Sequence, residues 1–431
     1  MNNALVKQLW QEIDKLPIID PHTHIRPRHS TALSIAEILS YHYYTELVNA
    51  TEFQPGGFPT DDPRRFTKTL LEKLSIISNT VQYDWLLSLA QNLYGISRQD
   101  WAPDNWASLF DRAQQVIDQP SYPQDVIRKS NIKRVFLTNA YNEDLAGVDT
   151  SFYVPCLRVD PFMDYASSPK EWASLGLFAG TDGRTVAGYK AGLDKAFARF
   201  AELGMAYAAF SSPPNLVTRY VAEEDAARVL AKAVTGAALS AEEKGLWAAY
   251  GMNQVAERCR RYGRPFHLMI GVNRTTYAQG VPSGTDLFDS VNSMKGYDYL
   301  LNEYADVTFP TSVLSDTSGL ELTAAAWIRH NVWPSGHWWY SNQPTDIARE
   351  LERRLNAVPY RKLIGYYSDA YYLEFVAPKF RMYKFELAVA LANRIERSQI
   401  HPNMAPLSVE SALQLAEDVL INNVKRVYKL A

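Results

Sequence analysis

The chain has 431 residues, of which 47% are hydrophobic, and its formal net charge is -3 at pH 7. This length suits one large α/β barrel with insertions or two domains, and the lack of a basic excess excludes general affinity for nucleic acid or anionic membranes. No basic start precedes an apolar run, and no stretch reaches the ~20 apolar residues of a membrane span, so we expect neither signal peptide nor anchor. Two distant cysteines, Cys156 and Cys259, fit a reducing cytoplasm.

The first part of the chain predicts a short helix over 5–15 and then a buried strand that begins at Leu16. The strand ends in the polar motif Asp20-Pro21-His22-Thr23-His24. Residues two apart on a strand point to the same face, so His22 and His24 should project together from its end. Two neutral imidazoles form half of a site for a divalent transition metal, with zinc the expected occupant. The alternative is a pair of surface histidines in a loop, and the buried strand before them favours the metal.

Alternating strand and helix patterns organise the rest of the chain. Residues 29–125 contain apolar and aromatic residues at helical spacing and no flexible linker, which indicates a helical insertion and not an independent domain. We expect residues 1–28 to hold the first helix and strand, 126–400 the rest of the barrel and 401–431 a C-terminal helix. The further expected strands are 132–139, 152–159, 205–212, 265–272, 307–309, 332–333 and 363–368, nearly all followed by helices. Eight β/α units predict a (β/α)8 TIM barrel with a helical insertion after strand one.

Functional residues of such a barrel gather at the C-terminal ends of its strands. The eighth strand ends at Ser368-Asp369, and it should lie beside the first strand if the barrel closes. His22, His24 and Asp369 would then hold one metal and leave positions open for water or substrate. The alternative for Asp369 is the N-cap of the next helix, which is less consistent with the neighbouring histidine pair.

Two arginines and two tryptophans also fall at strand ends. Arg158 and Arg274 would place fixed positive charge in the mouth of the barrel, and guanidinium groups match carboxylates bidentately. An organic acid is therefore the natural ligand, although each arginine could equally form a structural ion pair. Trp338 and Trp339 are residues of a core or of a sugar-binding surface. His267 lies inside its strand, so we expect it to be packed.

These motifs resemble the uronate isomerase (glucuronate isomerase) family of the amidohydrolase superfamily, especially its shorter branch. The resemblance covers most of the chain and includes SYHYY in the insertion and GHWWY after strand seven. The matching segments are 20–24 (DPHTH), 40–44 (SYHYY), 157–161 (LRVDP), 269–272 (MIGV), 336–340 (GHWWY) and 368–370 (SDA).

The resemblance implies a TIM barrel of the amidohydrolase type that converts a hexuronate between aldose and ketose, such as D-glucuronate to D-fructuronate or galacturonate to tagaturonate. His22, His24 and Asp369 would hold one metal, and His42 and Tyr43 would reach from the insertion into the substrate pocket. Among the expected catalytic residues Asp369, Tyr43 and His42, the candidates for acid and base are Asp369 and Tyr43. The expected substrate-binding residues are Arg158, Arg274, Trp338, Trp339 and Tyr371.

The sequence departs from the family at one place and from many other amidohydrolases at two. Tyr371 stands two residues after Asp369, where family members usually carry arginine, and Lys379 or Arg381 on the following helix could swing into the mouth instead. Met269 replaces the strand-five histidine of many amidohydrolases, and residues 208–211 contain no lysine. A two-metal site bridged by a carboxylated lysine is therefore not expected.

Two other functions compete with the isomerase. One is a metal-dependent hydrolase of a sugar-acid lactone or a similar small ester, in which Asp369 acts as base. The other is a catalytically silent barrel that only binds an acid. The expected partner in each case is a small sugar acid, and the sequence leaves the oligomeric state open, a homo-oligomer included.

Overall fold

The strand that carries the histidine motif, β1 (Ile18–Asp20), pairs in parallel with β2 (Ile132–Phe136). The computed structural model describes residues 3–54 and 57–430. Its strands form two parallel sheets, with the orders β1-β2-β3 and β10-β9-β6-β5-β4. The remaining strands of these sheets are β3 (Tyr153–Val154), β4 (Leu157–Arg158), β5 (Ala208–Ser212), β6 (Phe266–Ile270), β9 (Phe309–Val313) and β10 (Val332–Pro334).

Single bridges and loop contacts join the two sheets into a barrel. Asn139 bridges to Leu157 between β2 and β4, and Ser335 bridges to Ile364 between β10 and the eighth segment. The ring closes where the His24 amide donates to the Ala370 carbonyl at 2.8 Å. The fold is the expected TIM barrel with a helical insertion after the first strand, although its ladder is not one continuous hydrogen-bonded sheet.

The third and eighth strands differ from the prediction. Residues 152–159 form two short strands instead of one, because Pro155 has no N–H to donate and its carbonyl accepts from Ala206. Residues 363–368 form no strand beyond the bridge at Ile364. The Gly365 amide donates to the Val419 carbonyl, and the Ser368 amide donates to the Asp20 carboxylate, so these groups are not available to a ladder with β1.

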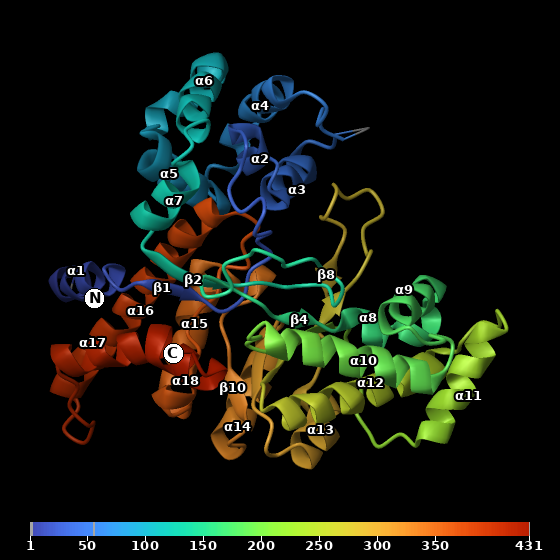
Figure 1. The fold of residues 1–431 in the computed structure, drawn as a ribbon. Coiled ribbons are helices and arrows are strands. Elements are labelled where there is room, and N and C mark those ends of the chain that lie inside the picture. Colours follow the sequence, from blue (N-terminus) through green and yellow to red (C-terminus); the bar gives the residue numbers. More distant parts are fainter. Residues whose placement is uncertain (1–2, 55–56, 431) are drawn as a thin grey trace.

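Helices lie outside the strands and over one end of the barrel (Figure 1). Those after the insertion are α8 (Asp160–Met163), α9 (Pro169–Ala179), α10 (Val186–Glu202), α11 (Glu223–Val234), α12 (Ala241–Tyr262), α13 (Asp298–Glu303), α14 (Asp316–Ile328), α15 (Pro344–Ala357) and α16 (Val376–Ile400). The expected single terminal helix is divided into α17 (Val409–Glu417), a π-helical turn (Asp418–Asn422) and α18 (Asn423–Tyr428). The π turn frees the Val419 carbonyl that accepts from Gly365. None of the described helices is long and apolar enough to cross a membrane.

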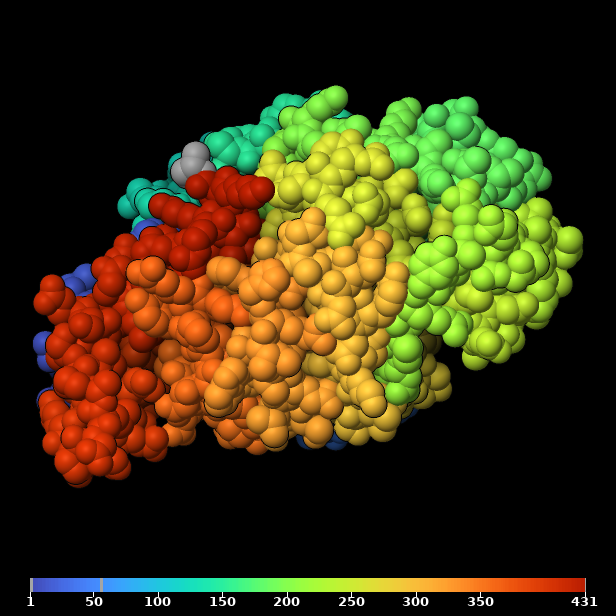
Figure 2. All heavy atoms as spheres, turned by 90° about the horizontal axis from the view of Figure 1, so that it is seen from below, coloured from blue at the N-terminus to red at the C-terminus, as the bar shows by residue number. Residues whose placement is uncertain are grey.

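The insertion stands over the C-terminal end of β1, above the barrel in Figure 1. Its helices are α2 (Ile35–Leu39), α3 (His42–Thr51), α4 (Pro63–Leu71), α5 (Val81–Tyr94), α6 (Trp106–Ile117) and α7 (Tyr122–Lys129), and α1 (Asn3–Asp14) precedes β1. Insertion residues such as Leu39 and Leu86 share one hydrophobic cluster with Val135 and Phe380 of the barrel. Seen from below, the surface is formed mainly by the later part of the chain (Figure 2). The insertion therefore covers the mouth, where strand ends gather.

Candidate metal centre and active site

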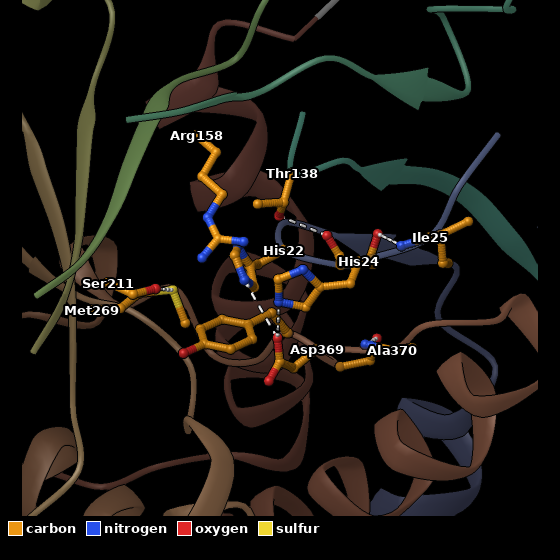
Figure 3. Close-up of polar contacts among 12 residues, drawn as sticks. His22, His24, Ile25, Thr138, Arg158, Ser211, Met269, Asp369 and Ala370 are labelled. Carbon is orange, nitrogen blue, oxygen red and sulfur yellow. Dashed lines mark hydrogen bonds and ion pairs between the residues drawn. The ribbon is translucent and has the colours of Figure 1, made fainter. Parts of the chain in front are cut away.

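Three side chains converge at the closure of the barrel (Figure 3). Nε2 of His22 lies 3.4 Å from Oδ1 of Asp369, and Nε2 of His24 lies 3.2 Å from the same oxygen. Their ligand atoms are all within 4.8 Å of one another, and this is the one such group among residues 3–54 and 57–430. The structure therefore brings together the three residues that the sequence predicted as one site.

The hydrogen bond at Nδ1 of His22 leaves the lone pair of Nε2 facing Asp369. Nδ1 of His22 lies 3.0 Å from the Tyr207 hydroxyl, which donates to the Pro21 carbonyl at 2.9 Å. Because that hydroxyl proton is engaged, Nδ1–H donates to the Tyr207 oxygen, and Nε2 carries no proton. A phenol that fixes the tautomer in this way is the support that metal-binding histidines use.

The protonation states also fit a cation. Burial lowers the pKa of His22, so its imidazole is neutral. Burial alone would raise the pKa of Asp369, and only hydrogen bonds and positive charge supplied from the positions of His22 and His24 hold it well below its ordinary value. Nε2 of His22 and Oδ1 of Asp369 are both buried without a hydrogen-bond donor. Neutral nitrogen lone pairs facing an anionic oxygen repel one another unless a cation lies between them, so the donor set fits a divalent metal.

The backbone at Asp369 is unusual. Asp369 has φ of +54°, a left-handed conformation that a residue with a Cβ rarely adopts. Its amide donates to the His22 carbonyl at 3.1 Å, and the preceding Ser368 amide donates to Asp20 at 3.0 Å. The motif of β1 therefore supplies two of the three candidate metal ligands and also holds the loop that carries the third.

A cavity of about 570 Å³ opens beside His24, between the insertion and the loops of the barrel. Tyr371 lines it and stacks on His24, with ring centroids 5.1 Å apart and planes at 26°. His42 lines it from α3, and burial lowers the pKa of His42 to about 4, so this ring is neutral. The wall also includes Arg26, Thr45, Phe58, Pro282 and Tyr372. Polar donors, aromatic rings and one metal ligand thus share one cavity.

Both predicted strand-end arginines form ion pairs. Arg158 extends from β4 toward His22 and His24 (Figure 3), and its guanidinium lies 3.1 Å from Asp160. Arg274 follows β7 (Val272–Asn273), which forms a hairpin with β8 (Leu287–Phe288), and it lies 2.7 Å from Asp286. The charges of both arginines act on the Tyr371 phenol. The structure therefore brings them near the cavity, although neither lines its wall.

The other predicted residues lie deeper. Trp338 is buried in a small cluster with Met269 and Tyr367, and Trp339 stacks on its neighbour Tyr340. Tyr43 is buried behind His42, with ring centroids 4.2 Å apart. His267 is fully buried against His22 and Tyr207, as expected of a packed histidine.

The suggestion that Lys379 or Arg381 swings into the mouth is wrong. Lys379 is fully buried beneath Asp369 and donates to Tyr41 and to the Ser368 carbonyl. Arg381 instead pairs with Asp14, at the start of the barrel. A helix places side chains two residues apart on different faces, so the two cations have different partners, and these partners hold each of them away from the cavity.

Sequence reasoning missed two residues of the site. Tyr207 orients His22 from the residue directly before β5, and only its place in the apolar run MAYAAF indicated a buried position. Arg26 lines the cavity two residues after His24, and no acidic side chain in the described ranges pairs with it. Its place directly after the histidine motif was the available signal.

Comparison with known proteins agrees with this architecture. The sequence model of the glucuronate isomerase family matches residues 1–428. A uronate isomerase of Rhizorhabdus wittichii is 22% identical over 99% of this chain and 96% of its own length, and one of Thermotoga neapolitana is 22% identical over 99% and 98%. The crystal structure of uronate isomerase from Thermotoga maritima superposes with a TM-score of 0.90 at 20% identity, covering 99% of this chain and 98% of that one. The glucuronate isomerase of Caulobacter crescentus gives 0.89 at 18%, covering 99% and 94%. The chain belongs to the glucuronate isomerase family.

Proposed function

We propose that this protein is a metal-dependent isomerase that converts hexuronates between aldose and ketose, of the D-glucuronate to D-fructuronate type. The observation that carries the proposal is the convergence of His22, His24 and Asp369 beside a cavity of sugar size. Membership of the glucuronate isomerase family supports the same reaction.

Zinc is the metal we propose for this centre. Two imidazole nitrogens and one carboxylate oxygen suit zinc and leave positions open for a substrate. When bound, the ion would polarise the substrate carbonyl and offset the negative charge that develops during proton transfer. We also place the enzyme in the cytoplasm, because its two cysteines are free and buried.

The residues of the chain divide the proton transfer between them. The Asp369 carboxylate would remove the proton from the carbon beside the carbonyl, since it lies next to His24, which lines the cavity. His42 is neutral and faces the cavity, and Tyr43 behind it stays protonated because burial holds its pKa well above the ordinary value. His42 would therefore deliver the proton to the neighbouring carbon, with Tyr43 as the source of that proton. These two residues come from the insertion, which would also exclude water from the reacting carbons.

Binding of the sugar acid falls to residues around the mouth. Arg158 points toward the metal ligands and would hold the carboxylate or an oxygen of the substrate, with Arg274 at the rim. Tyr371 would contact the sugar from the cavity wall, and Trp338 and Trp339 would support its apolar face from the barrel side.

Proton exchange tests the proposal directly. The zinc-loaded protein is incubated in deuterated water with D-glucuronate and D-galacturonate, and NMR follows both the ketose product and deuterium at the carbon beside the carbonyl. We expect exchange and ketose with at least one sugar, and neither in the His22→Ala/His24→Ala variant. Hydrolysis of sugar-acid lactones without exchange would overturn the isomerase in favour of the hydrolase. Binding without either reaction would favour the silent barrel.

A further inference from the structure

Beneath the metal centre, the ammonium group of Lys379 occupies a box of aromatic rings. Lys379 lies on α16 and is fully buried. Its Nζ is 4.9 Å from the ring centroid of Tyr41, 5.3 Å from that of Tyr43 and 4.7 Å from that of Trp85. All three rings belong to the insertion, while Lys379 belongs to the barrel. The cation therefore joins these two parts of the chain through cation–π contacts.

Hydrogen bonds direct the same cation at the loop of Asp369. Nζ donates to the Ser368 carbonyl at 2.9 Å and to the Tyr41 hydroxyl at 2.8 Å. The Tyr41 hydroxyl in turn donates to the Asp369 carbonyl at 3.3 Å. Lys379 and Tyr41 thus hold two successive carbonyls of the loop that presents the third metal ligand.

The hydrogen bonds from Lys379 and Tyr41, together called the clamp, act on the residue of the site that has a strained backbone. Asp369 has φ of +54°, and its amide is held from the other side by the His22 carbonyl. A left-handed residue with a Cβ persists when its surroundings fix the peptides on both sides. The bonds from Lys379 and Tyr41 fix the 368 and 369 carbonyls, and the bond to His22 fixes the amide.

We propose that Lys379 and Tyr41 are positioning residues for the metal centre, which hold Asp369 in the left-handed conformation that turns its carboxylate toward His22 and His24. The inference rests on the proposed role of these three residues as metal ligands. It also gives the insertion a second role, because Tyr41, next to His42 of the cavity, connects the position of the insertion to the geometry of the metal site.

The same helix offers a matched control. Lys384 lies five residues further along α16, is also buried, and donates to the carbonyls of Asp14 and Leu16 at 3.1 and 2.7 Å. Those carbonyls precede β1 and lie at the opposite end of the strand from the metal ligands. Loss of Lys384 removes a buried ammonium and two carbonyl contacts without touching the Asp369 loop.

The experiment compares metal binding in three full-length variants, Lys379→Met, Tyr41→Phe and Lys384→Met, with the wild type. Apparent Kd values for Zn²⁺ come from competition with a chromophoric chelator, and the visible spectrum of the Co²⁺-loaded protein reports the ligand geometry. We expect Lys379→Met to weaken binding by about 10- to 100-fold, the range for lost support of a metal ligand, and to alter the Co²⁺ bands. Tyr41→Phe should show a smaller change in the same direction, and Lys384→Met should lower the thermal midpoint while leaving Kd and spectrum unchanged.

Different outcomes separate the two proposals. Wild-type protein that binds no divalent metal would overturn the proposed function and this inference together. Wild-type binding with unchanged Kd and Co²⁺ spectrum in a folded Lys379→Met variant would overturn this inference alone. Where Lys379→Met does not fold, Tyr41→Phe decides, because it keeps the ring and removes only the hydroxyl that bonds to Asp369. An unchanged Kd and spectrum in Tyr41→Phe would then refute the clamp.

Discussion

Replacing Arg158 with methionine tests whether its charge serves the substrate or only Asp160. Loss of one partner from a desolvated charge pair costs about 2–5 kcal/mol. The Arg158 side chain is 41% exposed, which places its expected contribution at the lower end, about 2 kcal/mol. At about 1.36 kcal/mol for each factor of ten, we expect kcat/KM for hexuronate to fall by about 30-fold, with the fold intact.

The unpaired carboxylate of Asp160 complicates the single variant, because it would repel an anionic substrate. The double variant Arg158→Met/Asp160→Asn removes that repulsion. Steady-state kinetics of both variants on glucuronate, with thermal midpoints as the folding control, separate the two effects. If Arg158 binds the substrate, the double variant stays close to the single variant. A single variant within about threefold of the wild type, or full recovery in the double variant, would refute the reasoning.

Three other predictions concern the metal, the cavity wall and a buried carboxyl group. Elemental analysis of protein purified without chelators should give one divalent ion per chain, lost in His22→Ala/His24→Ala; two ions or none would contradict the site. Tyr371→Arg should raise the rate of deuterium exchange into glucuronate, because it places a guanidinium directly beside His24, and an unchanged or lower rate would count against this role. Burial raises the pKa of Glu374 from 4.5 to about 7, so its ionisation costs stability as pH rises through that window. In urea unfolding, the free energy of unfolding of Glu374→Gln should rise relative to that of the wild type between pH 4.5 and about 7, by up to about 3 kcal/mol. A pH-independent difference would exclude this cause.

Hydrophobic periodicity and the residue types at strand ends were sufficient to predict most of the fold. The apolar run before Asp20 and the repeated strand–helix alternation located the barrel strands in sequence, and closure of a barrel placed Asp369 beside His22. The breaks in the barrel were not predictable in the same way. Pro155 divides the third strand, and the Gly365 amide of the eighth segment bonds to the Val419 carbonyl, far along the chain. Such long-range partners leave no periodic pattern in the chain.

Side-chain partners in the site were harder to predict than its ligands. The histidine motif is recognised from its spacing and Asp369 from its place at the end of the eighth strand, whereas the role of Tyr207 depends on which carbonyl its hydroxyl meets. The partners of Lys379 could not be predicted from the sequence either. Its position on the helix after Asp369 suggested a cation for the mouth, and only packing shows that three aromatic rings and the Ser368 carbonyl hold it beneath the loop.

The position of Lys379 bears on the substitution at Tyr371. Burial raises the pKa of Tyr371 to about 12, so at neutral pH its hydroxyl offers one donor and no charge. Lys379 cannot supply the missing charge, because its bonds are used in holding Ser368 and Tyr41. Arg158 and Arg274 each face a carboxylate, which partly offsets their attraction for an acid. Arg26 lines the cavity without an ion pair among the described residues. The cavity wall of this enzyme therefore keeps one free guanidinium in the part of the chain that the structure describes, on the loop after His24 and not on the loop after Asp369.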